Sequence, residues 1–208
     1  MNRRKLLLAG LTLPLLISCS KPKNAKIPSG SKVIALGDSL TFGYGATPET
    51  AYPTVLANKT GWEVINEGVS GDTSEGVLKR LDKVIEVNPK LLLLGIGGND
   101  VLQRVAPTTT TSNINQIIDK LKSANIPMVL IAEPYFSTSA LLGVASDNPI
   151  YEQIAKDKDV ILFAKGDGGW SKILSDEKLK SDQIHANAEG YAKFAENLYA
   201  FLKELGFV

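Results

Sequence analysis

Short apolar runs alternate with longer segments of helical periodicity along most of this 208-residue chain. Each run is bounded by Gly, Pro, Asn or Asp, as the buried strands of a parallel sheet are. Strands that alternate with helices form a sheet with helices on both faces, joined by right-handed crossovers. The sequence therefore predicts a doubly wound α/β fold of three layers, α/β/α, around a five-stranded parallel sheet. The expected strands are residues 33–36, 64–65, 91–94, 128–132 and 160–163.

The clearest helical pattern is the last one, where apolar residues recur along one face of 188–205. Polar, glycine-rich stretches follow three of the expected strands directly, at 37–39, 68–72 and 95–100. Doubly wound sheets bind their ligands beyond the carboxyl ends of the strands, so these three stretches should share one cleft. Further helices are expected over residues 51–59, 74–86, 112–124 and 150–156.

The beginning of the chain differs in kind from the rest. Residues 2–5 are mostly basic, and the apolar run 6–17 is too short to span a bilayer comfortably. The run ends just before Cys19, the only cysteine, in a stretch that resembles the lipobox of bacterial lipoproteins. A lipidated Cys19 predicts a protein held to a membrane of the bacterial cell envelope, facing the periplasm or the exterior. The predicted division is a signal peptide over 1–18, the lipidated cysteine and a flexible tether over 19–31, and one folded domain over 32–208.

Composition narrows the classes of partner. The chain has 23 basic and 22 acidic residues, so it lacks the basic excess that binding to a phosphate backbone requires. A hydrophobic content of 44% is that of an ordinary globular enzyme domain. We therefore expect a small-molecule substrate and no nucleic acid, and the sequence does not identify a protein partner.

The only histidine, His185, restricts the possible chemistry. A serine hydroxyl becomes a good nucleophile when a neighbouring base takes its proton, and a carboxylate must then orient that base. Asp182 lies three residues before His185, which places both side chains on one turn before the final helix. Ser39 lies directly after the first expected strand. These three residues are the predicted catalytic group.

Attack on a carbonyl also creates an oxyanion, which needs preorganised hydrogen-bond donors. The candidate donors are the backbone N–H of Gly71, the side-chain amide of Asn99 and the backbone N–H of Ser39. Asp72 and Glu75 have the spacing of a capping box, which predicts a helix that begins just after Gly71. Two more carboxylates, Asp38 and Asp100, are predicted to support these loops by accepting backbone hydrogen bonds.

Other kinds of site fit the sequence poorly. The glycine pairs at 43–45 and 95–97 begin like dinucleotide-binding loops, but the third glycine of that motif is replaced by Pro48 in one case and Asp100 in the other. One histidine and one cysteine are too few for an ordinary zinc site. The Gly-x-Ser-x-Gly elbow is absent around Ser39. We therefore predict neither a metal nor a cofactor.

Four short motifs together resemble the SGNH hydrolases, also called GDSL esterases, and among them the bacterial thioesterase/lysophospholipase/arylesterase group. The resemblance covers nearly all of the chain after Lys32, and it implies a flavodoxin-like fold. It also implies a triad of Ser39, Asp182 and His185, with Ser39, Gly71 and Asn99 as oxyanion donors. One departure is Ala186, where the family often has a proline after the histidine. The motifs, in family order, are Gly37-Asp38-Ser39-Leu40, Ser70-Gly71-Asp72-Thr73, Gly97-Gly98-Asn99-Asp100 and Asp182-Gln183-Ile184-His185.

The expected reaction is the hydrolysis of carboxylic esters or thioesters, including lysophospholipids. Phe42, Tyr44 and the segment 133–148 carry aromatic and aliphatic residues that are expected to form an apolar acyl pocket. Two alternatives stay open. One is a carbohydrate O-acetylesterase of the cell envelope that uses the same residues. The other is a lipoprotein that keeps the fold for binding and has lost catalysis.

Overall fold

Five strands pair in parallel in the computed structural model, which describes residues 24–135 and 145–208. Their order across the sheet is β2-β1-β3-β4-β5, which is that of flavodoxin-like doubly wound folds. The register places Gly37 opposite both Gly68 and Gly95, so three neighbouring strands end at one level. The predicted five-stranded parallel sheet is confirmed. The strands are β1 (Lys32–Gly37), β2 (Glu63–Gly68), β3 (Leu91–Gly95), β4 (Met128–Ile131) and β5 (Ile161–Phe163).

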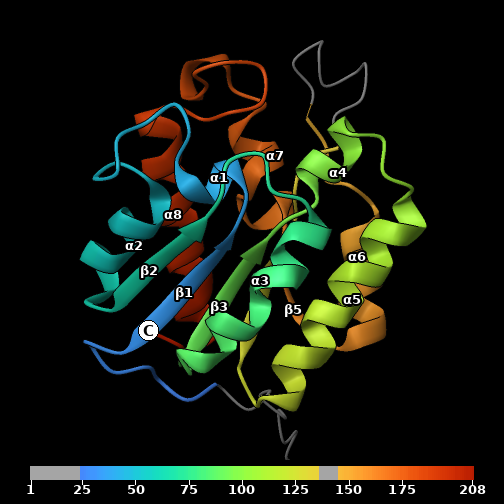
Figure 1. Ribbon diagram of the computed structural model, residues 1–208. Coiled ribbons are helices and arrows are strands. Elements are labelled where there is room, and N and C mark those ends of the chain that lie inside the picture. Colours follow the sequence, from blue (N-terminus) through green and yellow to red (C-terminus); the bar gives the residue numbers. More distant parts are fainter. Residues whose placement is uncertain (1–23, 136–144) are drawn as a thin grey trace, which may run out of the picture.

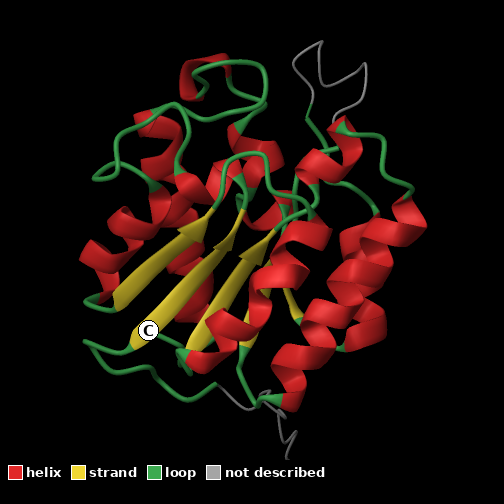
Figure 2. Ribbon diagram, in the orientation of Figure 1, coloured by secondary structure: helices red, strands yellow, loops and turns green. Residues whose placement is uncertain are grey.

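Helices cover both faces of this sheet, as Figures 1 and 2 show. Val33 and Ala35 of β1 pack on one face with side chains of α2, α7 and α8. Ile34 and Leu36 pack on the other face with α3, α5 and α6. Because the strands are buried on both sides, they read as continuous apolar runs in the sequence. The helices named here are α2 (Tyr52–Thr60), α3 (Ser74–Glu86), α5 (Pro107–Ser123), α6 (Ile150–Lys158), α7 (Trp170–Ile173) and α8 (Ala188–Glu204).

Two short helices follow strands where the sequence predicted only loops: α1 (Ser39–Phe42) after β1 and α4 (Gly98–Leu102) after β3. Helices of four and five residues are too short to show a helical period. α5 begins more than a turn before the predicted 112–124, because Pro107 is accommodated in its first turn, where an N–H is not needed. Within the described ranges, no helix has both the length and the apolarity to cross a bilayer.

The segment before β1 packs against the folded body. The N–H of Ile27 donates to the carbonyl of Phe207 at 2.8 Å, and the indole N–H of Trp62 donates to the carbonyl of Ile27 at 3.1 Å. The Ile27 side chain is only 6% exposed, and burial of this apolar group favours the packed conformation. The described part of the predicted tether, 19–31, is therefore bound to the domain. Cys19 lies outside the described residues.

Candidate active site

Ser39 occupies the turn between β1 and α1. Asp38 caps α1, because its carboxylate accepts the N–H of Leu40 at 3.0 Å, and Ser39 is the first residue of the helix. α1 passes so close to β2 that a Cβ at Gly68 would lie 2.1 Å from the nitrogen of Phe42, so only glycine fits there. Ser39 is 8% exposed, and it lines a cleft at the carboxyl edge of the sheet.

The loop before α8 brings Asp182 and His185 to this serine. His185 Nε2 lies 3.0 Å from Ser39 Oγ, and His185 Nδ1 lies 2.8 Å from Asp182 Oδ2. The other oxygen of this carboxylate, Oδ1, accepts the backbone N–H groups of Ile184 and His185, each at 2.8 Å. The carboxylate is therefore bound within its own turn. The hydrogen bonds form an unbroken chain from Asp182 through the imidazole to the hydroxyl.

The charge of Asp182 suits this arrangement. Burial raises the pKa of its carboxyl, but hydrogen bonds from the His185 ring and from the N–H groups of Ile184 and His185 hold that pKa below its usual value. The ionised carboxylate favours the tautomer with a proton on Nδ1, which leaves Nε2 able to accept one. The ring of Tyr44 packs beside the imidazole, with 4.4 Å between ring centroids.

The loop is fixed to the amino end of α8. The N–H of Ser181 donates to the carbonyl of His185 at 3.0 Å, and Lys180 and Ala186 form an antiparallel bridge. Asn187 caps α8 by accepting the N–H of Gly190 at 3.0 Å. Ala186 is fully buried at 0% exposure. An alanine therefore supports the turn here without the proline that is frequent in the family.

The three predicted oxyanion donors line the same cleft. Gly71 has a φ of +83°, a left-handed conformation that favours glycine. Asn99, on α4, donates from Nδ2 to the carbonyl of Asp72 at 3.0 Å. The N–H of Ser39 is the first of α1 and so has no acceptor within the helix. The cleft has a volume of about 260 Å³ and is lined by Asp38, Ser39, Leu40, Tyr44, Ser70, Gly71, Gly98, Asn99, Leu102, Glu133, Ile184 and His185.

Asp72 does not cap α3, and the predicted capping box with Glu75 is wrong. The cap is Thr73, whose hydroxyl accepts the N–H of Gly76 at 3.3 Å. Glu75 instead forms an exposed ion pair with Lys79 at 2.7 Å. The carboxylate of Asp72 is held elsewhere, by a guanidinium group from the next turns of α3.

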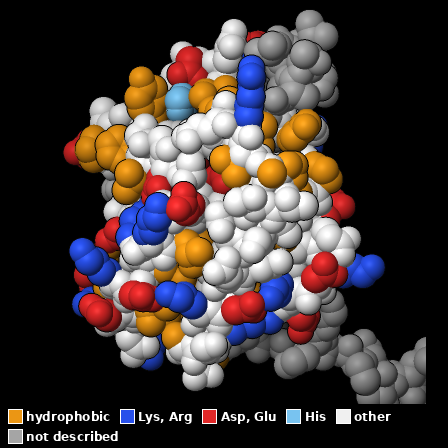
Figure 3. All heavy atoms as spheres, turned by 45° about the vertical axis from the view of Figure 1, so that its right-hand side comes forward, with side chains coloured by type: hydrophobic (Ala, Val, Ile, Leu, Met, Phe, Trp, Pro, Cys, Tyr) orange, Lys and Arg blue, Asp and Glu red, His pale blue; other side chains and the backbone are white. Residues whose placement is uncertain are grey.

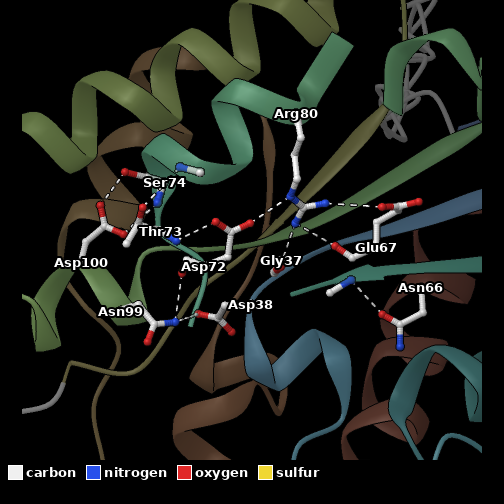
Figure 4. A network of polar contacts seen from close by, with 12 residues as sticks. Gly37, Asp38, Asn66, Glu67, Asp72, Thr73, Ser74, Arg80, Asn99 and Asp100 are labelled. Carbon is white, nitrogen blue, oxygen red and sulfur yellow. Dashed lines mark hydrogen bonds and ion pairs between the residues drawn. The ribbon is translucent and has the colours of Figure 1, made fainter. Parts of the chain in front are cut away.

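That guanidinium belongs to Arg80, which joins three loops of the site (Figure 4). Its Nε donates to the Asp72 carboxylate at 2.9 Å. Its Nη2 donates to the carbonyl of Gly37 at 3.1 Å and to that of Glu67 at 2.9 Å, at the ends of β1 and β2. Because the carbonyl of Asp72 in turn accepts from Asn99, Arg80 is linked to the position of every predicted oxyanion donor.

Sequence analysis did not single out Arg80. Arg80 is half-buried on an ordinary amphipathic helix, and two of its partners are backbone carbonyls, of Gly37 and Glu67, that lie 43 and 13 positions away in the sequence. The available signal was the spacing of Asp72 and Arg80, which are eight residues apart, with Arg80 in α3 and Asp72 just before the Thr73 cap of that helix. That spacing alone does not predict a contact with Gly37.

The second predicted supporting residue, Asp100, joins α4 to α3 and α5. It is 1% exposed. Its Oδ2 accepts the N–H of Ser74 at 2.8 Å, and its Oδ1 accepts the hydroxyls of Ser74 at 2.5 Å and Thr110 at 3.2 Å. The carboxylate therefore fixes Asn99, its neighbour in α4, relative to the start of α3.

Asp38 is buried directly beside the site at 2% exposure. Burial raises the pKa of its carboxyl to about 7, and the negative charges of Asp72 and Asp100 add to this effect. Its second oxygen lies 3.4 Å from Asn99 Nδ2. A change of charge on Asp38 is thus felt next to an oxyanion donor.

The walls of the cleft differ in part from the expected apolar pocket. Tyr44 lines the cleft as predicted, but Phe42 does not and is 53% exposed. Figure 3 shows the histidine at the surface with apolar side chains nearby. From the predicted segment 133–148, the residue that lines the cleft is the acidic Glu133, and residues 136–144 lie outside the described part.

The arrangement combines an alcohol, a base and an acid with nearby N–H donors, which is the equipment for acyl transfer. Among the described residues, no group of three or more His, Cys, Asp and Glu side chains is placed to hold a metal ion.

The sequence matches the GDSL-like lipase/acylhydrolase family over residues 35–193. The chain therefore belongs to this family, in agreement with the resemblance of its four motifs. It is a GDSL esterase- or thioesterase-like hydrolase that acts on ester bonds.

Individual relatives agree with this placement. Thioesterase 1/protease 1/lysophospholipase L1 of Escherichia coli (strain K12) is 30% identical over 172 residues, which cover 79% of each chain. An acetylxylan esterase of Geobacillus stearothermophilus is 26% identical over an alignment that covers 88% of this chain and 97% of the relative. The psychrotrophic esterase EstA from Pseudoalteromonas sp. has a TM-score of 0.70 at 24% identity, with 84% of this chain and 97% of EstA covered. The structural likeness supports the fold.

Proposed function

We propose that this protein is a serine esterase that hydrolyses carboxylic esters or thioesters through an acyl-enzyme formed on Ser39. The observation that supports this most is the hydrogen-bond chain from Asp182 through His185 to Ser39, with distances of 2.8 Å and 3.0 Å. These distances suit proton transfer to a general base. They are reached without any rearrangement of the loop before α8.

In the first half of the reaction, Ser39 Oγ attacks the carbonyl carbon while His185 Nε2 takes the hydroxyl proton. The carbonyl oxygen becomes an oxyanion and accepts hydrogen bonds from Ser39 N, Gly71 N and Asn99 Nδ2. His185 then gives its proton to the leaving alcohol or thiol. In the second half, His185 takes a proton from water as the water oxygen attacks the acyl carbon and forms a second oxyanion. The bond from that carbon to Ser39 Oγ then breaks, His185 returns the proton to Oγ, and the acid is released.

Labelling with a fluorophosphonate tests the nucleophile directly, because this reagent phosphonylates activated serines. We expect labelling of the wild-type domain and none of Ser39→Ala. A matched control is Ser70→Ala, since Ser70 lines the same cleft without a histidine partner, and this variant should label normally. A folded wild-type domain that resists labelling and cleaves no ester would favour the non-catalytic binding protein.

The acyl preference is tested by turnover of p-nitrophenyl esters from acetyl to palmitoyl. We expect activity on simple alkyl esters. A second candidate is a carbohydrate O-acetylesterase, which is favoured by the similarity to an acetylxylan esterase. Turnover of acetylated sugars with no turnover of p-nitrophenyl alkanoates would select that candidate.

We also propose that Cys19 is lipidated and holds the enzyme to a bacterial membrane. The support is the basic stretch 2–5, the apolar run 6–17 and the position of the only cysteine directly after them. Growth of an expressing bacterium with an alkyne-bearing fatty acid should label the full chain, and Cys19→Ala should abolish the label. A wild-type chain without lipid would contradict the proposal.

A further inference from the structure

Glu133 is a buried acid in the wall of the cleft. It is the second residue after the end of β4, and it is 1% exposed. It lines the cleft together with Ser39, Asn99 and Leu102. The proposed mechanism makes no use of this carboxyl.

The Glu133 carboxyl lies over the end of β3. A Cβ at Gly95 would come within 2.9 Å of Glu133 Oε1 and within 3.7 Å of Thr41 Oγ1. Glycine at position 95 therefore leaves the space in which the carboxyl lies. The acid is thus seated between the last residue of β3 and α1, next to the helix that carries the nucleophile.

Neither oxygen of this carboxyl has a hydrogen-bond partner among the described residues. Most buried polar groups in proteins are paired, so an unpaired carboxyl in a ligand-binding cleft needs an explanation. A substrate atom that occupied the cleft could provide the partner.

Burial favours the protonated, neutral form of the Glu133 carboxyl over the charged one. Burial raises its pKa well above the usual value, and the negative charges of Asp38 and Asp147 act in the same direction. A protonated carboxylic acid has one O–H donor. The group it offers to the cleft is therefore a neutral donor, which suits a neutral acceptor oxygen.

The geometry of the reaction indicates which part of the substrate reaches Glu133. In the tetrahedral intermediate, the carbon bound to Ser39 Oγ has three other substituents. The oxyanion faces the N–H donors, and the leaving group must lie by His185 to receive its proton. The acyl chain takes the remaining direction. The strand order β1-β3-β4 places Glu133 beyond Asn99 as seen from Ser39, on the β4 side of the cleft. An acyl chain that runs towards β4 would therefore reach it.

We infer that Glu133 is a specificity-determining residue that donates a hydrogen bond to an acceptor oxygen in the acyl chain. This inference rests on the proposed function. The substrate class is an ester or thioester whose acyl group carries an ether, keto or hydroxyl oxygen a few atoms from the carbonyl. Plain alkyl chains of the same length would leave the donor unpaired and would react less well.

Matched substrate pairs test this inference. The first pair is p-nitrophenyl methoxyacetate and p-nitrophenyl butyrate, which differ by one oxygen in place of a methylene group. The second is p-nitrophenyl 3-methoxypropanoate and p-nitrophenyl pentanoate. Each ratio of kcat/KM is divided by the ratio of hydroxide-catalysed rates, which removes the intrinsic reactivity. We expect the wild type to prefer the oxygen-bearing ester of at least one pair about tenfold or more.

Variants then assign the preference to the side chain. Glu133→Leu should lose the preference, and Glu133→Gln should keep it within about threefold, because the amide retains an N–H donor. Glu152→Leu, at an exposed position on α6, should not change the ratio. Because each ratio compares two substrates on one preparation, a partly unfolded variant still gives a valid value.

An unchanged ratio in Glu133→Leu, or a wild type without preference in either pair, would overturn the inference and leave the proposed esterase function intact. A wild type that cleaves no ester and resists fluorophosphonate would instead overturn the proposed function, and the inference with it.

Discussion

Two regions that meet at Ser39 are held in opposite ways. The Asp182–His185 turn is exposed, with a 45% exposed Asp182 side chain, and the hydrogen bonds of the Asp182 carboxylate join residues at most three apart. The loops that carry Gly71 and Asn99 are held by Arg80 and Asp100, whose hydrogen bonds reach residues 43 and 26 positions away in the sequence. The acid–base pair is thus built locally and the oxyanion site by the tertiary fold. The first should tolerate damage to the rest of the molecule better than the second.

The largest effect is expected where the two regions share an atom, at Ser39 Oγ. Ser39→Ala and His185→Ala should each lower kcat by about 10⁴ to 10⁶, and the double variant should lose scarcely more, because members of a triad act as a unit. Steady-state kinetics on p-nitrophenyl acetate measures this. Additive losses would show that the two residues do not act together.

Asn99→Ala probes the oxyanion region by itself. Loss of one donor typically lowers kcat by about 10² to 10³. The KM should change little, since the bond strengthens only as charge develops on the carbonyl oxygen. The matched control is Asn66→Ala, on β2, whose side chain bonds to backbone atoms away from the cleft. An equal loss of kcat in the control would indicate general disruption of the fold.

Asp38, which is buried beside the oxyanion donors, should make the unfolding free energy of the protein depend on pH. Its pKa is 3.8 in the unfolded chain and about 7 in the folded protein, so the native state binds the proton more tightly. The resulting stability is present below pH 4 and is lost as the pH rises through 7. Relative to Asp38→Asn, the wild type should lose about 2 kcal/mol or more of unfolding free energy between pH 4 and pH 8. Urea denaturation at a series of pH values measures this, and a constant difference would contradict it.

Substitution of Arg80 tests how far the Gly71 and Asn99 donors depend on contacts made outside the cleft. Arg80→Ala should lower kcat about tenfold, because the Gly71 and Asn99 donors lose their common support, and a misplaced group costs rate even without direct contact. Arg80→Lys should restore little, since a lysine cannot make the forked contacts. Lys79→Ala, one residue away and 70% exposed, is the control and should be neutral. Fluorophosphonate labelling should persist in all three variants, because the Ser39–His185 pair is built elsewhere.

The same contrast explains what the sequence could predict. The spacing of Asp182 and His185 is local, so it indicated their contact correctly, and the apolar runs indicated the sheet because burial on both faces leaves a continuous pattern. Ser39, Gly71 and Asn99 were placed together because parallel strands end at one edge.

The remaining features depend on contacts that no local pattern records. Arg80 reaches Gly37 over 43 positions of sequence. Thr73, rather than Asp72, caps α3, and the Asp72 carboxylate binds Arg80 instead. Glu133 interrupts a run of apolar residues that read as a uniform wall. For Arg80, a partner distant in sequence decides between two locally acceptable arrangements.

The packing of Ile27 against Phe207 has a consequence for orientation. These residues lie at the end of the sheet where β1 begins, whereas the cleft opens where β1 ends, roughly 20 Å away for a strand of this length. Figure 1 shows the start of the described chain and the carboxyl terminus at that far end. A surface that tethered the protein by the residues preceding Asn24 would therefore face the end of the sheet where β1 begins. The cleft would open away from that surface, towards compounds that diffuse in the surrounding fluid.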